Sequence, residues 1–425
     1  MKKISNRRSW DCLVIGAALF AMFFGAGNMI FPPYLGLQAG KDWFLAFLGY
    51  YIADIGLAVL AMLALIRTGG SEGLLRPLGK VWGTGLMLAI ILCLGPLISI
   101  PRTAATTFEL SIQPLVPGMN MLLFCAIFFL AVCLLSINES AVVDIVGKIL
   151  TPLLFCSLLL LIGKGVLTPL GPAAGKALNS RVIASGISAG YQTMDVLAST
   201  VFGALILNSA AQKGHTDRKS QTRVAMGASL VAGAGLLVVY LGLTYLGATA
   251  RALPNTRLTR IELLIALIRA LLPGQFGLVF FAVIAGLACL TTAIALTSAS
   301  ARYFSGLSGG KLSYRTAVIG ICVFSALVSG VGVEQLVTLA SPILSIVYPP
   351  VLALVLLSFV GREHAVWMYR LPAAAAMAVG LLEVLVSFGA PEALLNWLPL
   401  SGLGFAWVMP VAVTAGIGAL LQKGK

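Results

Sequence analysis

The sequence predicts an all-α, polytopic membrane protein with about twelve transmembrane helices. Of its 425 residues, 59% are hydrophobic and 10% are charged, and the mean hydropathy is +1.02. Ordinary soluble domains carry about 25% charged residues. The apolar runs are continuous, whereas a membrane β-barrel alternates over segments of about 10 residues. A span needs about 20 residues and a connection about 5 to 15, which leaves room for roughly 10 to 13 helices.

The charge and cysteine patterns exclude other classes. The net charge of +14 comes from basic residues in short loops between apolar runs, so the positive-inside rule explains it better than nucleic-acid binding. The seven cysteines are an odd number without a CxxC motif, which argues against a disulfide framework and a zinc site. His215 and His364 fall in polar loops. We therefore expect no resident metal or cofactor.

Each expected span is an apolar run bounded by polar or Gly/Pro-rich residues. The spans are Cys12–Leu35, Trp43–Ile66, Lys80–Thr106, Met119–Asn138, Ile145–Leu167, Ser185–Asn208, Arg223–Gly247, Phe276–Ser300, Arg315–Gly330, Leu336–Phe359, Leu371–Gly389 and Gly402–Leu421. Most Lys and Arg residues then share one side, so both termini are expected in the cytoplasm. Between the seventh and eighth spans, residues 256–272 predict an amphipathic helix on the membrane surface or over the bundle.

The first span contains Gly25, Gly27 and Asn28 near its middle, followed by Pro32 and Pro33. Lipid tolerates unwound backbone only where protein or water surrounds it. We therefore expect a broken helix whose free N–H groups suit a carboxylate and whose free carbonyls suit a cation. A packing contact through the glycines is the alternative.

The sixth span carries Asp195 deep in an apolar run, within residues 190–203. A carboxylate at this depth costs about 2.5–3.5 kcal/mol on insertion scales, so a functional role is the first hypothesis. A structural hydrogen bond between helices is the alternative. In the eighth span, Thr291 and Thr292 follow Ala288 by one helical turn, so three oxygens can converge on a small hard cation.

The remaining polar residues in or near spans are interpreted as structural. Asp54, Glu334 and Glu383 are expected at the membrane interface. Arg102 and Glu109 are expected near the outer end of the third span, where they pair or snorkel.

Breaks five spans apart indicate two inverted repeats around a site at the membrane midplane. The whole chain, 1–425, is then one transmembrane domain. One repeat covers about residues 12–167, the other about 185–359, and two further helices lie within about 371–421.

Several of these segments resemble the bacterial branched-chain amino acid:cation symporters, the BrnQ-type carriers. The resemblance lies in GAGNMIFPPYLGLQAG (25–40), YQTMDVLASTVFG (191–203), LACLTTAIALTSASARYF (287–304) and Tyr348-Pro349-Pro350, and it covers nearly the whole chain. It implies a LeuT-like fold of five plus five helices, with the first and sixth broken. It also implies import of leucine, isoleucine and valine with sodium or protons.

The resemblance also implies the site residues. The substrate would contact Gly25, Ala26, Gly27, Asn28, Tyr191, Thr193 and Asp195. Sodium would be bound by the carbonyls of Ala21, Phe24 and Ala288 and by the hydroxyls of Thr291 and Thr292. Asp195 has no match in the wider fold relatives, so it either holds the substrate ammonium or acts as a coupling group.

We therefore expect a secondary symporter, not an enzyme, that works by alternating access in the bacterial inner membrane. Its partners are an amino acid, sodium or protons and the lipid bilayer, with no nucleic acid, and it is a monomer or weak oligomer. A carrier of another amino acid or a purine-like solute is the alternative within the fold. A channel and an intramembrane enzyme are rivals from other classes. The sequence has no cluster of catalytic residues at membrane depth, which argues against an enzyme. It also has no Walker motif, so transport driven by ATP is not supported.

Overall fold

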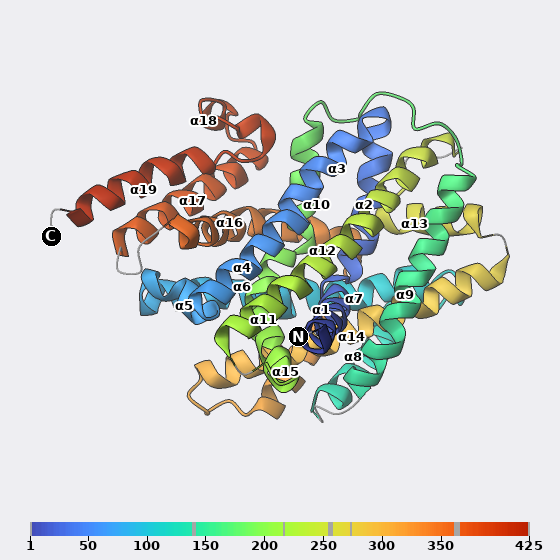
Figure 1. The fold of residues 1–425 in the computed structure, drawn as a ribbon. Helices are drawn as coiled ribbons and strands as arrows, with labels where there is room; N and C mark the ends of the chain where they lie inside the picture. The colour runs from blue at the N-terminus through green and yellow to red at the C-terminus, as the bar shows by residue number, and fades with distance from the viewer. Residues whose placement is uncertain are drawn as a thin grey trace.

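The computed structural model describes residues 2–137, 142–215, 217–253, 258–272, 274–360 and 366–423, and this part of the chain is helical without a strand (Figure 1). The first half holds α1 (Lys2–Phe23), α2 (Ala26–Ala39), α3 (Trp43–Tyr51), α4 (Leu57–Thr68), α5 (Ser71–Leu75), α6 (Lys80–Leu92), α7 (Ser99–Thr107), α8 (Met121–Ile137) and α9 (Val142–Leu167). The second half holds α10 (Val182–Thr193), α11 (Asp195–Gln212), α12 (Arg218–Thr249), α13 (Arg260–Leu271), α14 (Gln275–Leu307), α15 (Tyr314–Ser329), α16 (Val333–Val360), α17 (Val366–Ser387), α18 (Ala393–Asn396) and α19 (Val408–Lys423).

The predicted spans correspond to these helices, with shifts at their ends that are largest for the first span, because α1 begins at Lys2 rather than at Cys12. Within the described ranges, six helical segments are long and apolar enough to cross a membrane, or seven if one bent pair counts as a span. Shorter apolar helices accompany them, among them α8, α15 and α19. The last helix begins at Val408 rather than at Gly402, because Ser401–Leu403 form a separate 3-10 turn, η7. The count of twelve spans and the division into two repeats remain predictions.

The centre of the bundle is built around α12, which packs along both α1 and α2. Glycine allows this approach, because a Cβ at Gly36 of α2 would collide with the Thr244 carbonyl, and one at Gly247 would collide with the Pro33 carbonyl. On the other side of the centre, α10 packs on α3 and α11 on α4. Figure 1 shows α17, α18 and α19 at one edge of the bundle, beyond α16.

The second and third spans are irregular where they face the centre. In the second span, η2 (Ile52–Gly56) is a π-helical turn that contains Asp54. In the third span, η4 (Cys93–Leu97) interrupts the helix, because Gly95 has non-helical angles of φ −94° and ψ −125°. Such interruptions are frequent at functional sites. The second half of the third span, α7, therefore starts afresh at Ser99 and carries Arg102 beside the centre.

The helix α13 lies over the bundle, which is one of its two predicted placements. It begins with a capping box, in which Thr259 Oγ1 accepts from the Glu262 amide at 3.3 Å and the Glu262 carboxylate accepts from the Thr259 amide at 2.8 Å. Its apolar stripe, with Ile261, Leu264 and Ile268, is buried against α2, α14 and neighbouring elements.

Candidate functional site

The first span is broken at the predicted place. The helix α1 ends at Phe23, Gly25 is extended with φ −108° and ψ −167°, and α2 starts at Ala26. No side chain caps α2, and the first turn of any helix carries amide N–H groups without acceptors inside the helix. A small buried cavity is lined by the residues at this break, which are Gly25, Ala26, Gly27 and Asn28. The N-terminus of α2 therefore offers an anion-binding end to that cavity.

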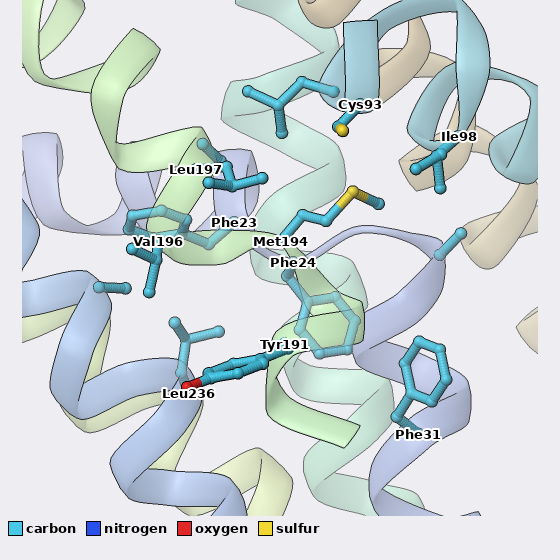
Figure 2. Packing of buried hydrophobic residues seen from close by; sticks show 14 of the residues in the cluster. Phe23, Phe24, Phe31, Cys93, Ile98, Tyr191, Met194, Val196, Leu197 and Leu236 are labelled. Atoms are coloured by element: carbon cyan, nitrogen blue, oxygen red, sulfur yellow. The ribbon is translucent and has the colours of Figure 1, made fainter. Parts of the chain in front are cut away.

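The sixth span is broken at Met194, between α10 and α11. Met194 adopts a left-handed conformation with φ 66° and ψ 19°, which costs a residue with a Cβ about 1–2 kcal/mol. Met194 is fully buried, and the next residue, Asp195, opens α11. Figure 2 shows the apolar side chains around the two breaks, with Phe23 and Phe24 from the first and Met194, Val196 and Leu197 from the second. Both breaks predicted by the sequence are confirmed.

The cavity lies between the two breaks. Its polar wall comes from α2, α7, α10, α11 and α14, with Asn28, Arg102, Thr193, Asp195 and Thr292. Its volume is about 20 Å³, and a water molecule needs about 10–15 Å³. In this conformation the cavity is too small for an amino acid, so it has to widen before a substrate of that size can enter.

A chain of buried hydrogen bonds joins the two broken helices. Asn28 Nδ2 donates to Asp195 Oδ2 at 2.9 Å and also contacts the Tyr240 hydroxyl of α12. Thr193 Oγ1 donates to Asp54 Oδ1 at 2.8 Å. Asp195 is 2% exposed and Asp54 is fully buried. The structure thus brings the predicted residues Asn28, Thr193 and Asp195 into one network.

Asp54 was expected at the membrane interface, and this expectation was wrong. The carboxyl group of Asp54 lies close to that of Asp195 and to the hydroxyl of Tyr50, and its Oδ2 has no hydrogen-bond partner among the described residues. Because a buried carboxylate in a membrane helix is costly, its burial beside a second carboxylate makes the pair a candidate for the functional site. The available signal was an acidic residue inside the second apolar run, the same signal that singled out Asp195.

Arg102 was expected to pair with Glu109 or to snorkel near the outer end of the third span, and this was also wrong. Its side chain lines the cavity, is 2% exposed, and Nη1 donates to the Gln192 carbonyl at 2.7 Å. Glu109 instead accepts a hydrogen bond from the Val333 amide at 2.8 Å. Glu334, likewise expected at the interface, forms an ion pair with Arg260 of α13.

Tyr191 does not lie in the cavity wall in this conformation. Its ring stacks on Tyr348 of α16 with centroids 4.5 Å apart, and its hydroxyl accepts from Trp407 Nε1 at 3.3 Å. Tyr191 therefore joins α10 to α16 and to the segment before α19. Its contact with substrate remains a prediction.

Of the predicted sodium ligands, the structure brings Ala288, Thr291 and Thr292 together on α14, and Thr292 lies beside Gly25 in the first break. Thr291 Oγ1 and Thr292 Oγ1 both donate to the Ala288 carbonyl, at 2.8 and 3.0 Å. A Cβ at Gly25 would lie 3.8 Å from Thr292 Oγ1, so this hydroxyl lies against the break. The Gly25 amide donates to the Phe23 carbonyl at 2.8 Å. The Ala21 carbonyl thereby loses its usual helical donor.

These oxygens suit a hard cation. The carbonyls of Ala21 and Phe24, the Ala288 carbonyl and the two hydroxyls carry no formal charge, and hard cations prefer several such oxygen ligands. Thr292 lines the cavity and donates to the Ala288 carbonyl, and Thr291 is its chain neighbour. Phe24 directly precedes Gly25, and Ala21 lies one helical turn before it. A cation here would lie directly beside the site between the breaks.

Known proteins share this sequence and this fold. A family model described as "Branched-chain amino acid transport protein" matches residues 8–425. The branched-chain amino acid transport system 2 carrier protein of Pseudomonas aeruginosa is 35% identical over 99% of this chain and 98% of its own length. Branched-chain amino acid permease BrnQ of Escherichia coli is 36% identical over 98% of this chain and 96% of its own length.

Solved transporters share the arrangement of helices at low sequence identity. The inward-facing conformation of Mhp1 matches with a TM-score of 0.59 and 15% identity, over 96% of this chain and 91% of Mhp1. A Na+-coupled sialic acid symporter matches with a TM-score of 0.60 and 14% identity, over 96% of this chain and 90% of that one. These likenesses show the LeuT-like fold. The curated relatives are carriers and permeases rather than enzymes, and with a match along nearly its whole length this chain belongs to the branched-chain amino acid transport protein family.

Proposed function

We propose that this protein imports leucine, isoleucine and valine across the bacterial inner membrane together with sodium, by alternating access, with both termini in the cytoplasm. The observation that carries the proposal is the cavity between two broken helices, which presents the N-terminus of α2 and the carboxylate of Asp195 to the same space. An amino acid has a carboxylate and an ammonium group a few ångströms apart. A helix N-terminus suits the first and a carboxylate suits the second.

The rest of the wall suits a branched aliphatic side chain. The apolar lining residues are Met22, Phe23, Leu94, Ala198, Phe202 and Leu296. Apolar pockets discriminate one methylene by only about 1–3 kcal/mol, so leucine, isoleucine and valine should compete with one another.

Sodium supplies the driving force in this proposal through the ligands around Ala288. One sodium ion gains about 2.3 kcal/mol when it crosses a potential of 100 mV. At about 1.4 kcal/mol per decade, this supports roughly 50-fold accumulation before any concentration gradient is counted. Proton coupling is the second candidate, because Asp54 and Asp195 lie side by side, and two carboxyl groups can bind one proton between them.

Alternating access requires a barrier on each side of the site, and the two barriers open in turn. On the side of α13, Arg260 contacts Glu334 of α16, and its guanidinium carbon lies 4.6 Å from the Tyr34 ring centroid and 5.6 Å from that of Phe31. In this proposal, these contacts close the route to the cavity past α2. On the other side, the cavity wall extends to Met22 and Phe202. We propose that the route past α2 opens when α13 moves. The route on the opposite side, past Met22 and Phe202, opens when α1 moves.

The test is uptake of labelled leucine into proteoliposomes that hold the purified protein. An inward sodium gradient should drive accumulation above equilibrium, and unlabelled isoleucine and valine should compete while a purine should not. Accumulation with a proton gradient alone would replace sodium with protons as the coupling ion. No accumulation in either gradient would reject symport, and conductance without saturable uptake would indicate a channel.

A further inference from the structure

Arg102 is a buried cation whose guanidinium forms no ion pair with a side chain in the described part of the chain. It lies on α7 in the cavity wall, its side chain is 2% exposed, and Nη1 donates to the Gln192 carbonyl at 2.7 Å. Its Nε has no hydrogen-bond partner. Among the described residues the guanidinium forms no ion pair, since the ion pairs found there involve other basic residues.

A neutral carbonyl does not compensate for burying such a charge. Moving a cation out of water costs several kcal/mol, and the cost is recovered only when an anion and further hydrogen bonds satisfy the group. Arg251 shows the contrast, because it donates to the carbonyls of Leu37, Lys176 and Gln38 and does not line the cavity. Arg251 is therefore satisfied by the fold itself, whereas Arg102 retains an unused donor at the cavity.

The guanidinium lies against the N-terminal turn of α2. Arg102 Nη2 would be only 2.8 Å from a Cβ at Gly27, so the absence of a side chain at Gly27 lets the guanidinium approach the helix backbone. The first amides of α2 are in the same turn and have no side-chain cap. Two independent groups that attract anions, a guanidinium and a helix N-terminus, therefore meet at one end of the cavity.

We propose that Arg102 binds the carboxylate of the transported amino acid, together with the first amides of α2. This assignment rests on the proposed function. The carboxylate supplies the missing counter-ion and accepts from Nε or Nη2 while Nη1 stays on Gln192. The ammonium group then faces Asp195, which also lines the cavity. A zwitterion is thus held between opposite charges, and the apolar side chain takes the remaining wall.

A ligand series separates this role from a structural one. Leucine carries both charges, leucinamide lacks the carboxylate, and 4-methylpentanoate lacks the ammonium. Binding of each is measured by competition against labelled leucine for the wild type and for Arg102→Met, Arg102→Lys and Arg251→Met. Losing a charge-assisted pair should weaken leucine and 4-methylpentanoate by about 10- to 100-fold in Arg102→Met, and leucinamide by less than about threefold.

The other variants serve as controls. Arg102→Lys keeps a cation and should retain part of the preference for leucine over leucinamide, which keeps the proposal testable if Arg102→Met does not fold. Arg251→Met removes an arginine that only holds carbonyls, so it should leave the ratio of the two affinities unchanged. Equal losses of leucine and leucinamide affinity in both Arg102 variants would overturn the assignment. A wild-type protein that neither binds nor accumulates any branched-chain amino acid would instead reject the proposed function itself.

Discussion

Asn28 Nδ2 donates to Asp195 Oδ2 at 2.9 Å, and this bond joins the two broken helices across 167 residues of sequence. Each residue lies in the first turn of the helix that follows its break. The bond therefore fixes the distance between the two helix ends that form the cavity. A substrate that binds between these helix ends contacts both α2 and α11. Its binding can therefore change how the two helices pack against each other.

The charge of Asp195 should matter more than its shape. Asp195→Asn keeps an oxygen that can accept from Asn28, but it removes the partner of the substrate ammonium. Leucine affinity should fall by about 10- to 100-fold, and leucinamide affinity should fall by a similar factor, because both ligands carry the ammonium. Equilibrium binding measures both. The matched control is Glu392→Gln, since Glu392 forms only an exposed pair with Arg181; unchanged binding in Asp195→Asn would exclude a direct role.

The hydroxyls of α14 should set the sodium requirement. Thr291→Val and Thr292→Val each preserve size and remove one oxygen ligand. The sodium concentration for half-maximal leucine uptake should rise about three- to tenfold, with a smaller change in maximal rate. Thr338→Val is the control, because Thr338 also bonds one turn back, to the Glu334 carbonyl, yet is exposed on α16. If all three variants shared the wild-type sodium dependence, the proposed ligands would be wrong.

Gly27 should tolerate no side chain. In Gly27→Ala the new Cβ would lie 2.8 Å from Arg102 Nη2 and 3.2 Å from Phe31, so the guanidinium must move. Overpacking of this kind costs about 1–3 kcal/mol, and leucine uptake should fall with it. Gly163→Ala on α9 meets nothing within 4 Å and should keep both thermal stability and uptake. Normal uptake in Gly27→Ala would show that the guanidinium does not need this approach to α2.

The apolar wall should determine which side chain fits. Ala198 of α11 lines the cavity and is 7% exposed. Ala198→Val adds two methyl groups to the space for the substrate, and the preference for leucine over alanine should fall by about tenfold or more. Ala211→Val adds the same volume at an exposed position of the same helix and should change nothing. Paired uptake assays with the two amino acids measure the ratio, and an unaltered ratio in Ala198→Val would place the side-chain pocket elsewhere.

Local sequence signals predicted the breaks and missed part of their surroundings. The first break was predictable from Gly25, Gly27 and Asn28, because glycine and asparagine have low helix propensity. The second break falls at Met194, which adopts a left-handed conformation although methionine is a good helix former. The local signal for this second break was Asp195, the acidic residue that directly follows Met194.

Arg102 and Asp54 were misplaced for a related reason. Their partners, Gln192 and Thr193, are 90 and 139 residues away, so no local pattern connects them. In addition, η4 interrupts the third span before Arg102, so the position of Arg102 along a continuous helix does not give its place in the fold. The cost of burying a charge in an apolar run, which indicates a functional role for Asp195, applies equally to Asp54 and Arg102.

The most direct test of the account is an experimental structure of the protein with leucine and sodium bound. The account predicts leucine between the N-terminus of α2 and Asp195, with its carboxylate on Arg102 and a cation beside Ala288 and Thr292. Leucine bound elsewhere, with residues 23–28 and 192–197 in unbroken helix, would contradict it.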